Sequence, residues 1–265
     1  MPVSNKVSNK VSNKELNNKK ALITGGSAGL GKALVEELCE QGWTVTSLDL
    51  KKPKGKLDYT FLKTDLSDRT VIDQLPEKLI EHGPFDLVIF NAGISATGKF
   101  EEMPISAYEK LMIVNAEGPM VLASQFANKG LMTAKSNMAF ISSLSHYTGY
   151  PGAAVYAATK DAIAVYAKSI IKPFSNLGIS VSCAFTGPLK TEHAVRHSPK
   201  NASDEDRMLP QEAAKLILPG ILSGKSKVFN GYKTMAIAFA GWLMPPVVSY
   251  ILLKTVYNKL DKNVF

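Results

Sequence analysis

Short apolar runs alternate with longer segments of helical periodicity from Lys19 onward. Nearly every position in the short runs is apolar, which is typical of strands that are buried on both faces of a parallel sheet. The clearest runs are Ala21–Thr24, Thr44–Leu48, Leu87–Phe90, Met138–Ser142 and Ile179–Phe185, and weaker ones cover Tyr59–Leu62 and Lys227–Asn230.

Four segments between these runs repeat apolar residues at helical spacing, namely Gly29–Glu40, Thr70–Glu81, Ser106–Asn128 and Ala153–Phe174. Gly42 and Gly178 stand where the C-terminal glycines of helices are expected. Such a β-α-β series predicts a single doubly wound α/β (Rossmann) domain with a mostly parallel sheet of six or seven strands. Ligands of this architecture bind at the carboxyl ends of the strands.

The two ends of the chain differ from this central region, 19–232. Three VSNK repeats lie within residues 3–14, and their polar composition predicts a disordered basic tail over 1–18, with a basic arm for an acidic partner as the alternative.

At the other end, 233–265 is expected to form an apolar helical segment. Its stretch Met235–Leu253 holds no charged residue. Pro245-Pro246 in the middle favours a helix-turn-helix over one continuous helix. Three roles remain open: a cover for the substrate mouth or a subunit interface, contact with a membrane surface, or a membrane span.

Composition and charge narrow the function classes. The 265-residue chain carries a net charge of +8, but half of this charge lies in residues 1–20, which argues against a nucleic-acid surface on the folded part. Cys39 and Cys183 form neither a disulfide framework nor a metal-binding pair, and no metal site is expected. With no secretory signal at the N-terminus, we expect a cytoplasmic protein, with membrane association through the C-terminal segment as an option.

A glycine-rich turn follows the first strand and opens the first helix, with the sequence TGGSAGLG over 24–31. Such a turn lets the backbone approach a pyrophosphate, and the helix N-terminus offers it free N–H groups. Asp49 ends the second strand, where a carboxylate accepts hydrogen bonds from the adenosine ribose and repels a 2′-phosphate. NAD(H) is therefore favoured, although Lys51 and Lys52 leave NADP(H) possible.

Tyr156 and Lys160 share one face of a predicted helix, where a nearby ammonium would lower the phenol pKa toward the working range. Tyr59/Lys63 and Tyr250/Lys254 have the same spacing. Only Tyr156 is preceded, thirteen residues earlier, by a hydroxyl at a strand's carboxyl end, that of Ser143.

Together these motifs, in this order and spacing, resemble the short-chain dehydrogenase/reductase family over roughly residues 19–227. The resemblance implies that Tyr156 is the acid–base, that Ser143 holds the substrate oxygen, and that Lys160 tunes Tyr156 and binds the nicotinamide ribose. It also implies that Asn115 anchors a water that links Lys160 to solvent. The cofactor-binding residues that the turn, Asp49 and the resemblance imply are Gly25, Ser27, Gly29, Leu30, Gly31, Asp49, Asp65, Leu66, Asn91, Ala92, Gly93, Tyr156, Lys160, Gly187 and Thr191.

This chain departs from the family pattern at three places. Phe90 replaces a first asparagine, Thr186-Gly187-Pro188 replaces the usual Pro-Gly, and the family's C-terminal ending is missing. The expected function is NAD(P)(H)-dependent hydride transfer to or from a hydrophobic alcohol or carbonyl compound, by a homodimer. One alternative is the same chemistry on a long-chain 3-oxo lipid at a membrane surface, and the other is a non-catalytic dinucleotide sensor.

Overall fold

Seven parallel strands form one sheet in the order β3-β2-β1-β4-β5-β6-β7. The computed structural model describes residues 19–53, 57–198, 205 and 207–265, so the tail expected over 1–18 lies outside it. The strands are β1 (Lys20–Thr24), β2 (Thr44–Asp49), β3 (Thr60–Lys63), β4 (Phe85–Phe90), β5 (Met132–Ser143), β6 (Ile179–Thr186) and β7 (Lys227–Phe229). The predicted fold class is confirmed, with seven strands, all parallel.

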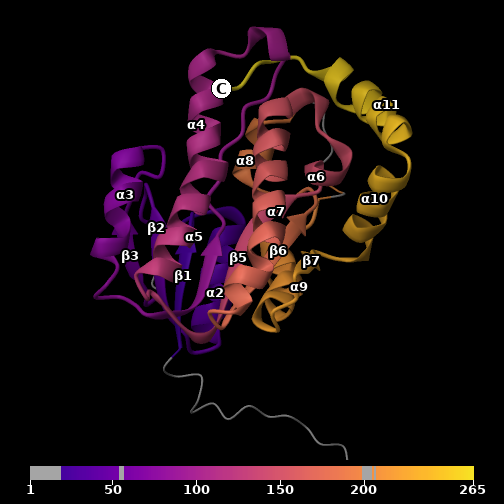
Figure 1. Ribbon diagram of the computed structural model, residues 1–265. Helices are drawn as coiled ribbons and strands as arrows, with labels where there is room; N and C mark the ends of the chain where they lie inside the picture. Colours follow the sequence, from indigo (N-terminus) through magenta and orange to yellow (C-terminus); the bar gives the residue numbers. More distant parts are fainter. Residues whose placement is uncertain (1–18, 54–56, 199–204, 206) are drawn as a thin grey trace, which may run out of the picture.

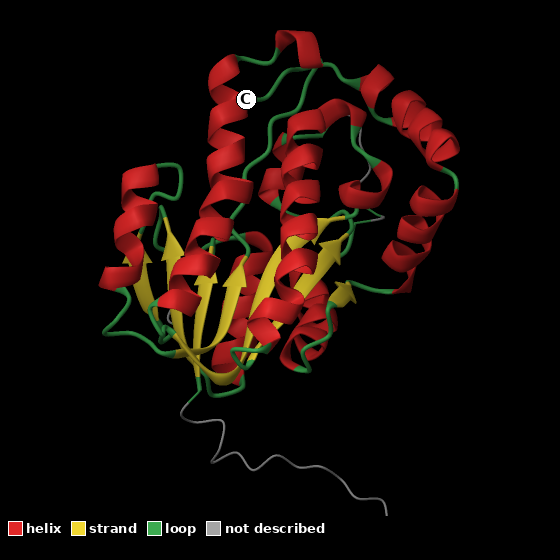
Figure 2. Ribbon diagram, in the orientation of Figure 1, coloured by secondary structure: helices red, strands yellow, loops and turns green. Residues whose placement is uncertain are grey.

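Helices cover both faces of this sheet (Figure 2). One face carries α3 (Arg69–Lys78), α5 (Gly118–Asn128) and α7 (Ala154–Ser175), and the other carries α2 (Gly29–Glu40) and α9 (Pro210–Leu222). Successive side chains of a strand point to opposite faces, so Leu22 packs into the first core and Ile23 into the second. Burial on both faces explains why the strands are apolar at almost every position.

The helix predicted over Ser106–Asn128 is continuous but not uniform. It comprises α4 (Ile105–Met112), the wider π-helical turn η2 (Ile113–Glu117) and α5, after a short 3₁₀ turn η1 (Phe100–Glu102). Such π turns occur frequently at functional sites, and this one contains Asn115.

Several short elements lie beyond the carboxyl ends of the strands (Figure 1). They are α6 (Ser145–Thr148), η3 (Pro151–Ala153) and α8 (Glu192–Arg196). The sheet order reverses between β1 and β4, which opens a crevice at this edge where α/β proteins bind their ligands.

The C-terminal segment forms α10 (Tyr232–Leu243), α11 (Pro245–Thr255) and the 3₁₀ turn η4 (Tyr257–Lys259), and then returns to the domain. Val264 exchanges two backbone hydrogen bonds with Thr97, at 2.9 and 2.8 Å. The predicted helix-turn-helix is confirmed. Within the described residues no single helix has the length and apolarity to cross a bilayer. The pair Tyr232–Leu243 and Pro245–Lys259 meets that test together, but it is bent by 116°.

Candidate active site

The glycine turn between β1 and α2 is held closely against the end of β4. The Asn91 amide donates to the carbonyl oxygens of Thr24 and Gly25, at 3.0 and 3.1 Å, and the Thr24 hydroxyl accepts from the backbone N–H of both Asn91 and Ala92, each at 3.0 Å. A Cβ atom at Gly31 would lie 2.0 Å from the Gly25 carbonyl oxygen, so the turn closes only with glycine there. The Asn91 side chain thus holds the turn in place, and its amide group is already hydrogen-bonded to the backbone of the turn.

The turn also contains a polar side chain that has no hydrogen-bond partner within the protein. The Ser27 hydroxyl is buried and has no hydrogen-bond partner, and the backbone N–H of Ser27 donates to Asp49 Oδ2 at 2.9 Å. Asp49 therefore lies at the carboxyl end of β2, directly beside the turn. A buried hydroxyl that lacks a partner is costly, and a pyrophosphate oxygen would satisfy it, so the residues present fit a dinucleotide.

Two further predicted site residues, Leu66 and Ala92, border one small pocket. Leu66, Ala92 and Val114 line a small, largely enclosed pocket together with Thr24 and Phe90. With a volume of about 10 Å³ this space is too small for an adenine ring, and its lining places it between β4 and the start of α5. Asp65 instead accepts hydrogen bonds from the Ser67 N–H and hydroxyl, which lower the pKa of its carboxyl.

Asn115 connects two parts of the site. Its side-chain oxygen accepts from the Ile94 N–H, and its amide donates to the Ile94 carbonyl, both at 2.9 Å, and to the Thr159 hydroxyl at 3.0 Å. Thr159 in turn donates to the Tyr156 carbonyl oxygen at 2.7 Å. Asn115 therefore ties the loop after β4 to the turn of α7 that carries Tyr156.

The predicted catalytic side chains converge at the carboxyl end of β5. Lys160 is buried, and its ammonium donates to the Ile141 carbonyl oxygen at 2.9 Å and lies 5.8 Å from the centre of the Tyr156 ring. A Cβ atom at Gly93 would lie only 3.2 Å from that ammonium. Ser143, the last residue of β5, stands close enough to Tyr156 to lower the pKa of its phenol by hydrogen bonding.

The electrostatics of this pair differ from the expectation in one respect. Burial raises the pKa of Tyr156, and the neighbouring Ser143 hydroxyl offsets this only in part. Burial also lowers the pKa of Lys160 to about 8. The phenol pKa is therefore raised overall and the expected net lowering is not found, because desolvation is the largest cause of its shift. The Lys160 ammonium donates to the Ile141 carbonyl oxygen.

The structure separates the three Tyr/Lys pairs of equal spacing. Lys63 ends strand β3, so Tyr59 and Lys63 do not share a helix face. Tyr250 and Lys254 do share one on α11, with the ammonium 4.7 Å from the ring centre, but Tyr250 is exposed and far from any strand end. Of the three pairs, only Tyr156 and Lys160 lie beside a serine at the carboxyl end of a strand.

Asn230 was missed by the sequence reasoning. It is buried directly after β7, and its side-chain oxygen accepts from the Gly187 N–H at 2.9 Å. It thereby positions the Thr186-Gly187-Pro188 turn, one of the departures noted above. A lone asparagine after a short strand carries no local signal of such a long-range contact.

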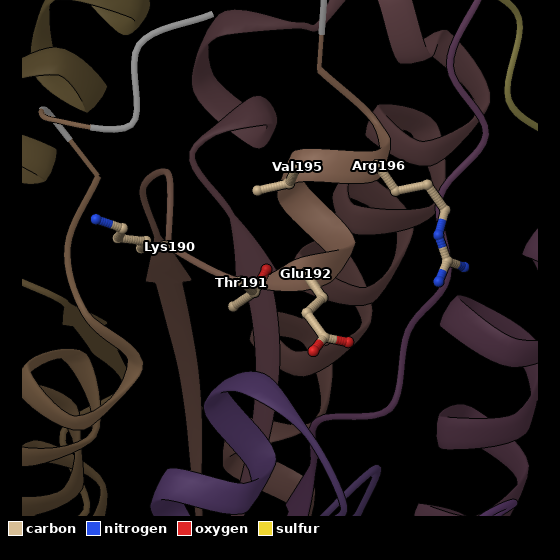
Figure 3. Close-up of a pocket in the computed structure, with 5 residues that line it drawn as sticks. All are labelled: Lys190, Thr191, Glu192, Val195 and Arg196. Atoms are coloured by element: carbon tan, nitrogen blue, oxygen red, sulfur yellow. The ribbon is translucent and has the colours of Figure 1, made fainter. Parts of the chain in front are cut away.

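Thr191 lies across the crevice from the glycine turn, since a Cβ atom at Gly29 would be 3.2 Å from its methyl group. Its hydroxyl accepts from the Ala194 N–H at 3.0 Å and so caps α8. Thr191 also lines an open pocket of about 420 Å³, together with Lys190, Glu192, Val195 and Arg196. Thr191 and Glu192 point toward the ribbon of the N-terminal region (Figure 3).

Thr97 connects the C-terminal end of the chain to the end of α8. Its backbone pairs with Val264, as described above, and its hydroxyl lies 3.1 Å from His197 Nδ1. Burial lowers the pKa of His197 to about 4. The rings of His193 and His197 lie 4.5 Å apart, but the part of the chain that the structure describes holds no group of three metal-ligating side chains.

Comparison with known proteins agrees with this geometry. The family model of short chain dehydrogenases matches residues 19–202. An uncharacterised oxidoreductase of Thermotoga maritima is 24% identical over 71% of this chain and 78% of its own length. The 3-oxoacyl-[acyl-carrier-protein] reductase MabA of Mycobacterium bovis is 28% identical over 66% of this chain and 71% of its own.

Among solved structures, a short-chain dehydrogenase of Sphingobium yanoikuyae in complex with NADPH superposes with a TM-score of 0.71. It is 18% identical, and the match covers 92% of this chain and 98% of the other. At this identity the likeness shows the fold, and it extends over most of both chains.

Proposed function

The chain belongs to the short-chain dehydrogenase/reductase family of NAD(P)-dependent oxidoreductases, and from this premise we propose that Tyr156 is its acid–base and its substrate a hydrophobic alcohol or carbonyl compound. The observation that carries the proposal is the meeting of Ser143, Tyr156 and Lys160 at the carboxyl end of β5. The surroundings of Tyr156 support the substrate class, because it packs beside Ile94, Val155 and a buried cluster that includes Met103 and Leu111.

Each residue has a distinct part in the proposed reaction. Tyr156 donates its phenolic proton to the substrate oxygen in reduction and takes it back in oxidation. Ser143 donates a hydrogen bond to the same oxygen, and the Lys160 ammonium stabilises the phenolate that reduction leaves behind. The glycine turn, Asp49, Leu66, Ala92 and Thr191 would hold the dinucleotide, which when bound supplies or accepts the hydride.

The substrate class is tested by a series of ketones and secondary alcohols of increasing chain length. The absorbance of the reduced nicotinamide reports turnover in both directions. We expect kcat/KM to rise with chain length, by up to about tenfold for every two methylene groups that enter an apolar pocket. A kcat/KM that stays level or falls along the series would argue for a polar substrate.

The pKa shifts predict how activity depends on pH. Because the pKa of Tyr156 is raised, the phenol keeps its proton at neutral pH, which is the form that carbonyl reduction requires. Lys160 keeps its charge below about pH 8. Reduction should therefore hold a level kcat/KM up to about pH 8 and fall above it, while oxidation should rise with pH. A reduction profile that already declines between pH 6 and 7 would contradict this assignment.

Cofactor choice is expected to depend on the charge of Asp49. We propose a preference for NAD(H), and Asp49→Asn keeps a hydrogen-bond acceptor for the Ser27 N–H while it removes the charge that repels a 2′-phosphate. The ratio of kcat/KM for NADP(H) to that for NAD(H) should rise by about tenfold, which is about 1.4 kcal/mol. Lys51→Ala/Lys52→Ala, at two exposed positions, should lower it. A ratio unchanged in Asp49→Asn would place cofactor selection elsewhere.

A further inference from the structure

Helices α10 and α11 expose a large apolar surface. The side chains of Phe239 and Trp242 are 60% and 67% exposed, and their rings lie 6.0 Å apart. No residue of α11 is buried. The exposed apolar residues of the two helices are Tyr232, Met235, Ile237, Phe239, Trp242, Leu243, Val247, Tyr250, Ile251 and Leu253, and Met244 joins them between the helices. Exposed apolar surface of this extent indicates an interaction site.

The two helices α10 and α11, which are joined at Met244 and form the α10–α11 hairpin, have one side that packs against α6. Thr234, Ala238 and Gly241 are the buried residues of α10, and a Cβ atom at Gly241 would lie 2.7 Å from the Tyr147 carbonyl oxygen of α6. The two helices form an arm along the outside of the domain (Figure 1). Among the described residues, no helix or strand covers the side turned away from α6.

The charged residues that flank the two helices in the sequence are mostly lysines. The sequence has no acidic residue between Glu212 and Asp261, whereas Lys233 and Lys254 stand at the two ends of the uncharged stretch and Lys259 and Lys262 follow. Interfacial helices with aromatic and aliphatic side chains flanked by lysines bind anionic lipid surfaces. A two-fold dimer through the side turned away from α6 would instead place the lysines of both copies at one interface, where like charges repel.

We propose that the α10–α11 hairpin docks the protein on an anionic lipid bilayer, with both helices lying in the headgroup region. At 1.5 Å per residue, α10 and α11 are about 18 and about 17 Å long, so neither spans a hydrocarbon core of about 30 Å. The bend of 116° between α10 and the segment that begins at Pro245 turns the chain back. The hairpin thus lies on the bilayer and does not cross it.

Docking would place the substrate side of the enzyme near the lipid. After α11 the chain packs Leu260 against Gly152, where a Cβ atom would be 3.1 Å from the leucine side chain, four residues before Tyr156. It then pairs Val264 with Thr97. This placement agrees with a hydrophobic substrate, but the docking itself does not depend on the proposed function.

Co-sedimentation of the full-length protein with vesicles tests the proposal directly. We expect binding to vesicles of phosphatidylcholine and phosphatidylglycerol at about 0.01 M salt and weaker binding at about 0.15 M, since the Debye length shrinks from about 30 to about 8 Å. Pure phosphatidylcholine should bind less. Phe239→Glu/Trp242→Glu should lower the partition coefficient by about tenfold or more per side chain.

A matched control uses the same substitution at equally exposed apolar positions elsewhere. Ile80 and Leu177 are each 59% exposed and lie after α3 and α7. Ile80→Glu/Leu177→Glu should bind vesicles as the unaltered protein does. Equal loss in both double variants would mean that net charge alone decides binding, which would overturn the docking site.

Fluorescence gives a second readout that is independent of sedimentation. Of the two tryptophans, Trp43 is 6% exposed and Trp242 is 67% exposed, so Trp43→Phe leaves Trp242 as the only reporter. Its emission should shift to shorter wavelength with anionic vesicles. No sedimentation and no shift would refute docking. A dimer in solution that Phe239→Glu/Trp242→Glu dissociates, without vesicle binding, would assign the surface to a second copy instead. None of these readouts uses turnover, so they stand apart from a failure of the proposed chemistry.

Discussion

Tyr156→Phe is expected to lower kcat by about 10²–10⁴-fold, which is the usual contribution of a positioned general acid–base. The phenylalanine ring keeps the contacts of Tyr156 with the apolar cluster near Val155 and Met103, while the exchangeable proton is lost. The affinity for the dinucleotide should stay within about twofold of the original, because only the hydroxyl is removed. Steady-state turnover and calorimetric titration with the cofactor measure the two effects separately.

The same helix provides the control for this variant. The Tyr166 hydroxyl donates to the Met120 carbonyl oxygen at 3.1 Å, away from the crevice. Tyr166→Phe should cost about 1 kcal/mol of stability through the lost hydrogen bond and leave kcat unchanged. Near-normal turnover in Tyr156→Phe, or an equal loss in both variants, would show that Tyr156 does not move the proton.

The pattern of apolar runs was enough to predict the sheet, because each strand is buried on both faces and contrasts with its polar connections. The pattern predicted the elements less well where a strand or helix itself contains polar or helix-breaking residues. β5 begins at Met132, six residues before the predicted start, because its first half is polar and partly exposed. Helix α9 (Pro210–Leu222) was not predicted, and Pro219 together with Gly220 interrupts its pattern in the sequence.

The features of the site also differ in how far the sequence predicts them. Residues joined by short spacing, such as Tyr156 and Lys160 or the glycines of the turn, could be found in the sequence. Contacts that depend on the folded topology could not. Asn115 acts through Ile94 and Thr159, both distant in sequence. The Lys160 ammonium is turned toward the Ile141 carbonyl because the side chain is buried. Helical periodicity in the sequence does not predict this orientation.

The other large effect is expected in the glycine turn, where Gly29→Val should weaken dinucleotide binding by at least about 100-fold, or about 2.7 kcal/mol. Gly29 has a φ of +52°, which a β-branched residue adopts only with strain, and a Cβ atom there would lie 3.2 Å from the Thr191 methyl group across the crevice. The added side chain would fill the space between the turn and Thr191, where the pyrophosphate is expected to pass. Calorimetric titration with NAD(H) and NADP(H) measures the loss.

Gly130→Val is the control that shows the effect of backbone strain alone, without a side chain in the crevice. Gly130 has a φ of +67°, and a Cβ atom there meets no atom within 4 Å. Strain of this kind costs about 1–3 kcal/mol at either position, so both variants should show a lower Tm. Only Gly29→Val should lose the cofactor, because only its side chain enters the crevice. If the two variants bind the dinucleotide equally well, the turn is not the pyrophosphate site, and the fit inferred from the unpartnered Ser27 hydroxyl fails with it.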